Sequence, residues 1–187
     1  QMRLFHLSDL HIGKRVNEFS MIEDQKYILE RILDLAEKEM PDGVILAGDI
    51  YDKQIPSAEA VQVFDEFITK LAERKLPVFV ISGNHDSAER LAFGGTVMKI
   101  PIADQYGTVW IHLLPFIRPA AVRRVFEDES DLITDVQSAV RAVISHMEID
   151  PNERNILVAH QFVTGASRCE SEDIQIGGLD NIDASVF

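Results

Sequence analysis

The sequence has little of several features that mark large classes of proteins. It contains one cysteine, Cys169, so no disulfide can form within the chain and a disulfide-stapled secreted scaffold is excluded. No apolar run is long enough to cross a membrane, and no secretory signal is visible. We therefore expect a cytoplasmic protein without a membrane association.

Positive charge is also scarce. The 187 residues include 18 Lys and Arg against 31 Asp and Glu, a formal net charge of −13. This balance argues against binding of nucleic acid by a general basic surface. It leaves a nucleic-acid enzyme open, because bound metal cations can supply positive charge where a phosphate sits. Solubility is the simpler meaning of the acidic balance.

Three common active-site motifs are missing from the sequence. We find no G-x-x-x-x-G-K-[ST] loop, no G-x-G-x-x-G and no G-x-S-x-G. The sequence therefore contains none of these motifs as evidence for a nucleotide-binding loop or a serine hydrolase.

What the sequence does contain is an alternation of short apolar runs with amphipathic helical patterns, without repeats or a clear linker. Strands are expected at 2–8, 44–48, 77–82, 108–116 and 155–160, and helices at 21–40, 58–73, 88–98 and 130–147, with Ser57 as an N-cap. This order predicts one α/β domain over 1–187, with a largely parallel sheet and helices on both faces.

Polar side chains follow four of these expected strands, where the carboxyl ends of parallel strands share one edge of the sheet. These residues are Asp9 and His11, then Asp49, then Asn84, His85 and Asp86, and finally His160. Taken singly, each Asp could be a cap or turn former and each His a structural residue. Caps do not account for the whole set in this order.

Carboxylates, imidazoles and one amide without cysteine suit manganese or iron, with zinc as an alternative. Asp49 could use both carboxylate oxygens, so we expect it to bridge two metal ions that hold a phosphate ester for in-line displacement. The histidines inside apolar runs, His6 and His112, are expected to be core residues or to support the ligands of the site from behind.

The "GD" and "GNHD" motifs resemble those of the calcineurin-like metallophosphoesterases. The segments "HLSDLHIGK", "GDIYDKQIPSAEAV", "SGNHDSAERLAFG", "LLPFIRPAAVR" and "VAHQFVTGASRCESEDIQIGG" are similar, over nearly the whole chain, to the SbcD-type nuclease subunits of double-strand-break repair. The resemblance implies layered β-sheets flanked by helices, with a metal site at the carboxyl ends of the strands.

The resemblance also implies roles for individual residues. Asp9 and His11 would bind a first manganese ion, Asp49 would bridge, and Asn84 and His160 would bind a second. His85 would stabilise the transition state and protonate the leaving 3′-side oxygen, and Asp86 would orient the His85 ring. Lys14, Arg15 and Arg90 would either contact DNA phosphates or be ordinary solvated charges.

Members of this group are manganese-dependent enzymes of DNA repair, recombination and replication. They degrade duplex DNA ends 3′→5′, cut single strands and hairpins endonucleolytically, and act as dimers with an SbcC-type coiled-coil ATPase. For this chain we expect the same activity and partners. The alternatives are a generic dimetal phosphodiesterase that acts on small diesters or nucleotides, and a non-enzymatic dimerising scaffold.

Two departures from the group's pattern bear on these expectations. The group completes its site with a Gly-His-x-His motif that this sequence does not contain, and its capping domain and partner-binding tail are also absent. We therefore expect weak metal binding and little activity from residues 1–187 alone. The stretch 94–106 is shorter than the pattern, which has an extra strand there.

A dimer could use apolar residues on two helices, namely Phe64, Phe67, Leu91, Phe93 and Val97.

Overall fold

The apolar runs form two three-stranded sheets in the computed structural model, which describes residues 2–86, 97–164 and 181–187. In the first sheet all strands are parallel, in the order β1-β4-β5, and in the second β7 pairs antiparallel with β6 and parallel with β8. A two-stranded hairpin, β2-β3, stands apart. The strands are β1 Leu4–Leu7, β2 Arg15–Val16, β3 Phe19–Ser20, β4 Gly43–Ala47, β5 Val78–Ile81, β6 Met98–Asp104, β7 Gly107–Leu114 and β8 Arg154–Ala159.

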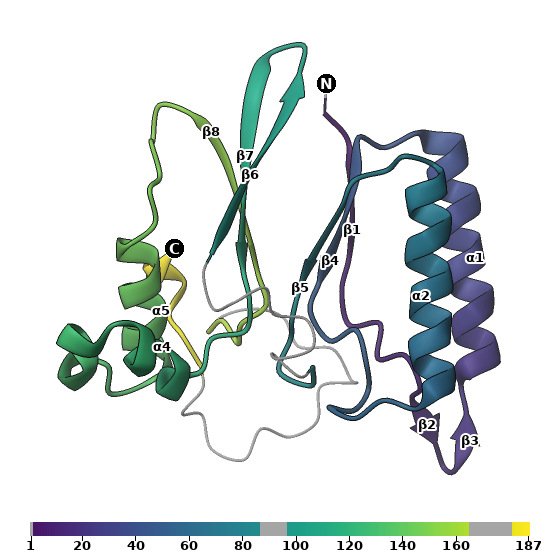
Figure 1. Ribbon diagram of the computed structural model, residues 1–187, viewed down its shortest axis with the longest axis horizontal. Coiled ribbons are helices and arrows are strands. Elements are labelled where there is room, and N and C mark those ends of the chain that lie inside the picture. The colour runs from purple at the N-terminus through teal and green to yellow at the C-terminus, as the bar shows by residue number, and fades with distance from the viewer. Residues whose placement is uncertain (1, 87–96, 165–180) are drawn as a thin grey trace.

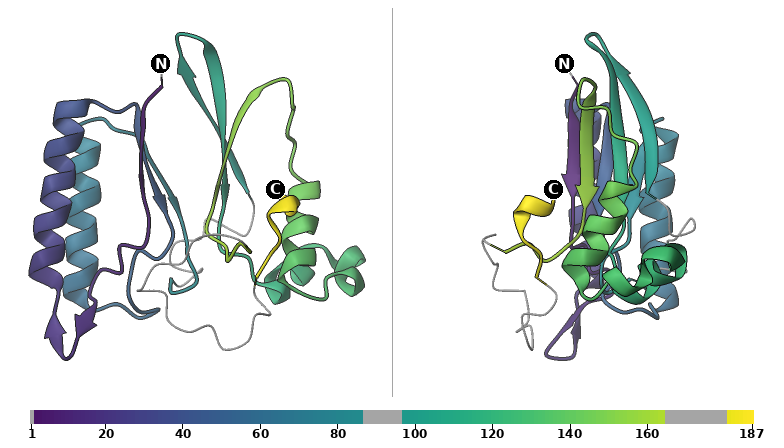
Figure 2. Two further views of the ribbon diagram at one scale, coloured as in Figure 1. Left: turned by 180° about the vertical axis from the view of Figure 1, so that it is seen from behind. Right: turned by 90° about the vertical axis from the view of Figure 1, so that its left-hand side faces the viewer.

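Among the described residues, helices cover only the outer faces of the two sheets, which gives four layers (Figures 1 and 2). Helices α1 and α2 pack on the first sheet, whereas α4 and α5 pack on the second together with two 3₁₀ turns. The helical elements are α1 Ile22–Glu39, α2 Ala58–Glu73, α4 Pro119–Val125, η1 Glu127–Leu132, α5 Val136–Ser145 and η2 Ala184–Val186. None of the helices in the described ranges is long and apolar enough to cross a membrane.

Strand β4 is buried over its whole length because it lies between a helical layer and the second sheet. Val44 and Leu46 belong to the apolar cluster under α1 and α2. Ile45 and Ala47 face the other way, into the cluster between the two sheets. Burial on both faces explains why this strand is continuously apolar rather than alternating.

The sequence predicted the first two helices closely. Ser57 is the N-cap of α2, and its side chain accepts a hydrogen bond from the Ala60 amide at 3.2 Å. Helix α1 ends at Glu39, where Met40 takes a left-handed conformation with φ 47° before Pro41. Both ends follow standard capping rules.

The prediction of one sheet with helices on both faces is wrong, because a second sheet occupies the inner face of the first. The helix expected at 88–98 lies mostly outside the described residues, and its last residue, Met98, begins β6 instead. Proline at position 101 is compatible with β6 because this strand is at a sheet edge. Helix α4 was not expected, and α5 is shorter than the predicted 130–147.

The two histidines expected in the core have different positions. His112 is buried at 2% exposure and its Nε2 lies 2.9 Å from Asn155 Oδ1, which confirms the expectation. For His6 the expectation is wrong. It is exposed because β1 is the edge strand of its sheet.

The apolar residues suggested for a dimer are mostly in the core. Phe67 is 2% exposed, and Phe64 packs against the same cluster under α1 and α2. Val97 packs on the cluster under α4 and α5. Leu91 and Phe93 lie outside the described residues.

One carboxylate ties the first sheet to the second at the edge where the strands begin. Asp104, at the end of β6, accepts hydrogen bonds from both guanidinium Nη atoms of Arg154, at 2.6 and 3.0 Å. It also accepts from the backbone amides of Met2 and Tyr106, at 3.1 and 2.9 Å. The Arg154 guanidinium holds the pKa of Asp104 well below its usual range.

This pairing predicts a pH-dependent contribution to stability. Because the folded pKa of Asp104 is lowered, its stabilisation is present above the ordinary carboxyl pKa of about 4 and is lost as pH falls through the folded value. We expect Asp104→Asn to lower the melting temperature at pH 7, with a difference from wild type that narrows below about pH 4. Asp65→Asn, at an exposed position of α2, is the control. An equal deficit for Asp104→Asn at every pH would contradict the assignment.

Candidate metal centre

Loops that follow β1, β4, β5 and β8 meet at the carboxyl ends of the strands. The β1 and β4 loops run side by side, with hydrogen bonds from Asp9 N to Gly48 O at 3.3 Å and from His11 N to Asp49 O at 2.9 Å. His160, after β8, is joined to the end of β4 because its Nδ1 lies 2.8 Å from the Ala47 carbonyl. The convergence expected from the sequence is therefore present.

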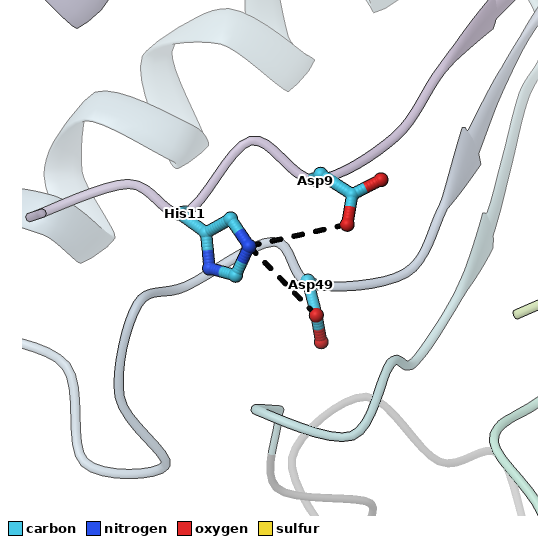
Figure 3. Close-up of side chains that lie close together, drawn as sticks. All are labelled: Asp9, His11 and Asp49. Atoms are coloured by element: carbon cyan, nitrogen blue, oxygen red, sulfur yellow. Dashed lines mark ion pairs between the residues drawn. The ribbon is translucent and has the colours of Figure 1, made fainter. Parts of the chain in front are cut away.

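Asp9, His11 and Asp49 present their ligand atoms to one another (Figure 3). His11 Nε2 lies 3.9 Å from Asp9 Oδ1 and 3.8 Å from Asp49 Oδ2. These distances are too long for hydrogen bonds. They match the roughly 3–4 Å that separates two atoms each about 2.1 Å from a shared divalent ion. The geometry of the three residues therefore fits a metal ion.

The same three residues have left-handed backbone conformations, which are rare outside glycine. Their φ angles are 55° for Asp9, 42° for His11 and 45° for Asp49. Each such residue costs on the order of 1 kcal/mol. Strain at three candidate ligands indicates that the local backbone serves the site rather than stability.

Asp49 lies between two imidazoles. Its Oδ2 is 3.8 Å from His11 Nε2 and 3.4 Å from His160 Nε2. Its Oδ1 accepts a hydrogen bond from the His85 amide at 2.9 Å. The sequence suggested that both oxygens of Asp49 would bridge. In the structure one oxygen, Oδ2, faces both histidines, while Oδ1 is held by the backbone.

The charges of this pair support each other. Burial raises the pKa of Asp49, but hydrogen bonds from His160 and from the His85 amide outweigh it, so the pKa is lowered overall. Burial lowers the pKa of His160, but the Asp49 carboxylate more than offsets this and raises it. Asp49 is therefore held as a carboxylate, as a metal ligand must be.

The glycines of the two motifs make room for these side chains. A Cβ on Gly48, which has φ 82°, would lie 2.4 Å from the His160 ring. A Cβ on Gly83 would lie 2.1 Å from Asp49 Oδ1. Both contacts are impossible for a real side chain, so glycine is required where the β4 and β5 loops approach the ligands.

Comparison with known protein families agrees with this geometry. A model of the calcineurin-like phosphoesterases matches residues 2–177. The chain belongs to the calcineurin-like phosphoesterase family. Membership implies divalent metal ions. In this phosphoesterase, Asp9, His11, Asp49 and His160 are the residues that would hold them.

Two curated relatives show a more specific similarity within this family. The chain is 33% identical to the SbcD subunit of nuclease SbcCD from Staphylococcus saprophyticus and 35% identical to that from Staphylococcus epidermidis, in each case over all of this chain. It spans about half the length of these relatives, 53% and 54%. A crystal structure of a dimetal phosphatase from Danio rerio, 12% identical, aligns with a TM-score of 0.47 over 86% of this chain and 69% of that one.

The GNHD segment of this phosphoesterase contains an amide side chain, at Asn84, and an imidazole, at His85. Asn84 is half-buried next to Gly83, in the loop that touches Asp49. The exposed His85 ring lies edge-on to the His11 ring, with centroids 5.1 Å apart. The backbone carbonyl oxygen of Asp52 lies 3.3 Å from His85 Nδ1.

Asp86 has a different position from the one expected. Its buried carboxylate, 1% exposed, accepts hydrogen bonds from three backbone amides: those of Ile50 at 3.1 Å, Tyr51 at 3.0 Å and Gly83 at 2.9 Å. The ring-orienting contact expected of Asp86 is made by the Asp52 carbonyl, because both Asp86 oxygens face the β4 and β5 loops. Asp86 thereby joins the loop of Asp49 to the loop of His85.

Two residues near the site were missed by the sequence analysis. The Gln25 side chain accepts from the Gly13 amide at 2.9 Å and donates to the carbonyls of Leu10 and His11, at 3.1 and 2.8 Å. Asp52 Oδ1 lies 4.0 Å from His11 Nδ1. The "GDIYD" segment contains Asp52 as a signal, whereas nothing in the helical pattern of α1 distinguishes Gln25.

Of the basic residues suggested for DNA contact, Lys14 and Arg15 lie where the β1 loop runs into the β2-β3 hairpin. Lys14 is half-buried, and the exposed Arg15 donates to the Glu18 carbonyl within the hairpin. Arg90 lies outside the described residues.

The contacts of Asp86 predict a structural effect of its replacement. We expect Asp86→Asn to lower the free energy of unfolding by about 2–4 kcal/mol, because an amide cannot accept from three buried N–H groups as a carboxylate does. Denaturant unfolding measures this. His85→Gln, one residue earlier and exposed, is the control that should keep its stability. An Asp86→Asn variant of unchanged stability that lost only turnover would favour the originally expected role.

Proposed function

We propose that this chain is the phosphoesterase domain of a metal-dependent DNA nuclease subunit of the SbcD type. Its activities would be 3′→5′ exonuclease action on duplex ends and endonuclease action on single strands and hairpins. The observation that supports this most is the group of Asp9, His11, Asp49 and His160 around one buried carboxylate oxygen. Similarity to the SbcD subunit of nuclease SbcCD across the whole chain supports the nuclease over other phosphoesterases.

Asp49 would be a ligand to both of two ions, with manganese as the expected metal. Asp9 and His11 would hold one ion, and Asn84 and His160 the other. When bound, the ions would supply Lewis acidity to the phosphodiester and its attacking water. The carboxylate and imidazole donors suit manganese. The Gly-His-x-His motif expected to complete the set stays a prediction.

His85 would be the proton donor to the leaving 3′-side oxygen. Its Nδ1 is beside the Asp52 carbonyl, which can only accept a hydrogen bond, so Nδ1 carries a proton. Nε2 is then the atom that takes up and gives the catalytic proton. Asp86 would act indirectly, by keeping the loops of Asp49 and His85 together.

The partners remain part of the proposal. DNA is the proposed substrate, an SbcC-type coiled-coil ATPase the proposed partner, a homodimer the proposed assembly and the cytoplasm the proposed location. The dimer would have to use residues other than Phe64, Phe67 and Val97, which pack in the core.

The test is an assay of the protein in its full natural length with Mn²⁺, on end-labelled duplex DNA and on bis(p-nitrophenyl) phosphate. We expect degradation of the duplex that a chelator abolishes. We expect His85→Gln to reduce it by about 10²–10⁴-fold, the usual contribution of a general acid. Arg124→Gln, an exposed change on α4, is the control.

Two outcomes would count against the nuclease. Cleavage of the small diester without duplex degradation would move the chain to the generic dimetal phosphodiesterases. Duplex degradation that persisted in the His85→Gln variant and in the presence of a chelator would come from a contaminant, and the proposal would lose its support.

A further inference from the structure

An unpaired guanidinium lies beside the metal centre. Arg118, in the loop after β7, is exposed, and its Nη2 donates to the backbone carbonyl of Asn84 at 3.2 Å. No carboxylate pairs with Arg118 within the part of the chain that the structure describes. Four other arginines there each pair with one. Arg118 is therefore available to another anion.

The loop that carries Arg118 is fastened to both neighbouring loops of the site. The Phe116 amide donates to the Ser82 carbonyl at 2.9 Å, directly before the GNHD segment. The Pro115 carbonyl accepts from Gln161 Nε2 at 3.2 Å, directly after His160. The position of Arg118 is thereby tied to the elements that carry two of the candidate ligands.

The backbone of Arg118 is also restricted on both sides. Ile117 is 8% exposed and belongs to the core under α4 and α5. Pro119 begins α4 and disfavours the helical conformation at Arg118, which is extended with φ −116° and ψ 124°. Because the backbone here is already fixed, no further backbone entropy is lost when the side chain binds a ligand.

The rim position of Arg118 decides which part of a substrate it would meet. Three of the ligand side chains are recessed, with exposures of 5% for Asp49, 15% for His160 and 20% for His11, whereas the Asp9 side chain is 55% exposed. The exposed guanidinium, bonded to the Asn84 carbonyl, lies at the rim of this group rather than among the ligands. One donor of Arg118 is used on Asn84, and its remaining N–H groups have the planar arrangement that fits phosphate oxygens.

We propose that Arg118 binds a phosphate adjacent to the one at the metal centre, and so favours polynucleotides over small diesters. The inference rests on the proposed function, because it assigns a substrate-binding residue to that same site. In a chain of net charge −13, a cation at this position also offsets repulsion between the acidic protein and a polyanion.

The first experiment compares two substrates on the protein in its full natural length: a single-stranded oligonucleotide and bis(p-nitrophenyl) phosphate, which has no second phosphate. We expect Arg118→Gln to lower kcat/KM on the oligonucleotide by about tenfold or more, as loss of a charge-assisted contact does. On the small diester we expect a change within about twofold. Arg118→Lys, which keeps the charge without the fork, should fall between. Arg124→Gln is the matched control.

The second experiment needs no turnover. Binding of the oligonucleotide is measured in EDTA at several salt concentrations. Loss of one phosphate contact should weaken binding and reduce the slope of log K against log salt by about 0.7 for a single strand. Arg124→Gln should leave the slope unchanged.

The outcomes separate this inference from the proposed function. Equal losses on both substrates, or an unchanged salt slope, would overturn it, because Arg118 would then only hold the Asn84 loop. If wild type cleaved neither substrate, the proposed function would fail, and the salt slope would still decide whether Arg118 contacts a phosphate.

Discussion

The carboxylate of Asp49 is the group on which the rest of the site depends. It stands at the end of β4, the strand buried on both faces between α1 and α2 and the second sheet. One of its oxygens faces His11 and His160, and the other is held by the His85 amide. A buried carboxylate needs such compensation because burial alone would neutralise it. The loops from three other strands provide it.

The architecture explains why this happens only at the carboxyl ends of the strands. The sheets and helices bury every apolar side chain of β4 and, at least in part, those of its neighbours, so polar groups can gather only where the strands end. There the backbone is strained at Asp9, His11 and Asp49, and the β1 and β4 loops are joined by backbone hydrogen bonds outside the named strands. Asp86 and Gln25 add further hydrogen bonds, each to three backbone groups. Side-chain contacts to the backbone thus reinforce the loops that carry the site.

Sequence reasoning reached the site more reliably than the layers around it. The carboxyl ends of neighbouring parallel strands share an edge, so the meeting of Asp9, His11 and Asp49 could be predicted from their order alone. His160 follows a strand of the second sheet, and it reaches the site because the end of β8 lies beside the end of β4. The residue pattern could not predict the second sheet, because a strand buried under a helix and one buried under a sheet are equally apolar. The layered sheets implied by the family resemblance are confirmed. Strand β6 was missed because it contains Pro101. Proline is acceptable in a strand at a sheet edge, and the edge position of β6 depends on the tertiary structure. The contacts of Asp86 and Arg118 depend on which backbone group lies opposite, and residue types do not encode that.

Manganese binding to the protein in its full natural length, followed by electron paramagnetic resonance, tests most directly whether Asp49 is shared by two ions. Wild type and the Asp65→Asn control should bind two ions with the spectrum of an exchange-coupled pair, since the ions of two-metal sites lie about 3.5–4 Å apart. Asp49→Asn should lose the coupling and weaken both sites together. Two uncoupled ions in wild type, or a coupled pair that survives Asp49→Asn, would contradict the shared carboxylate.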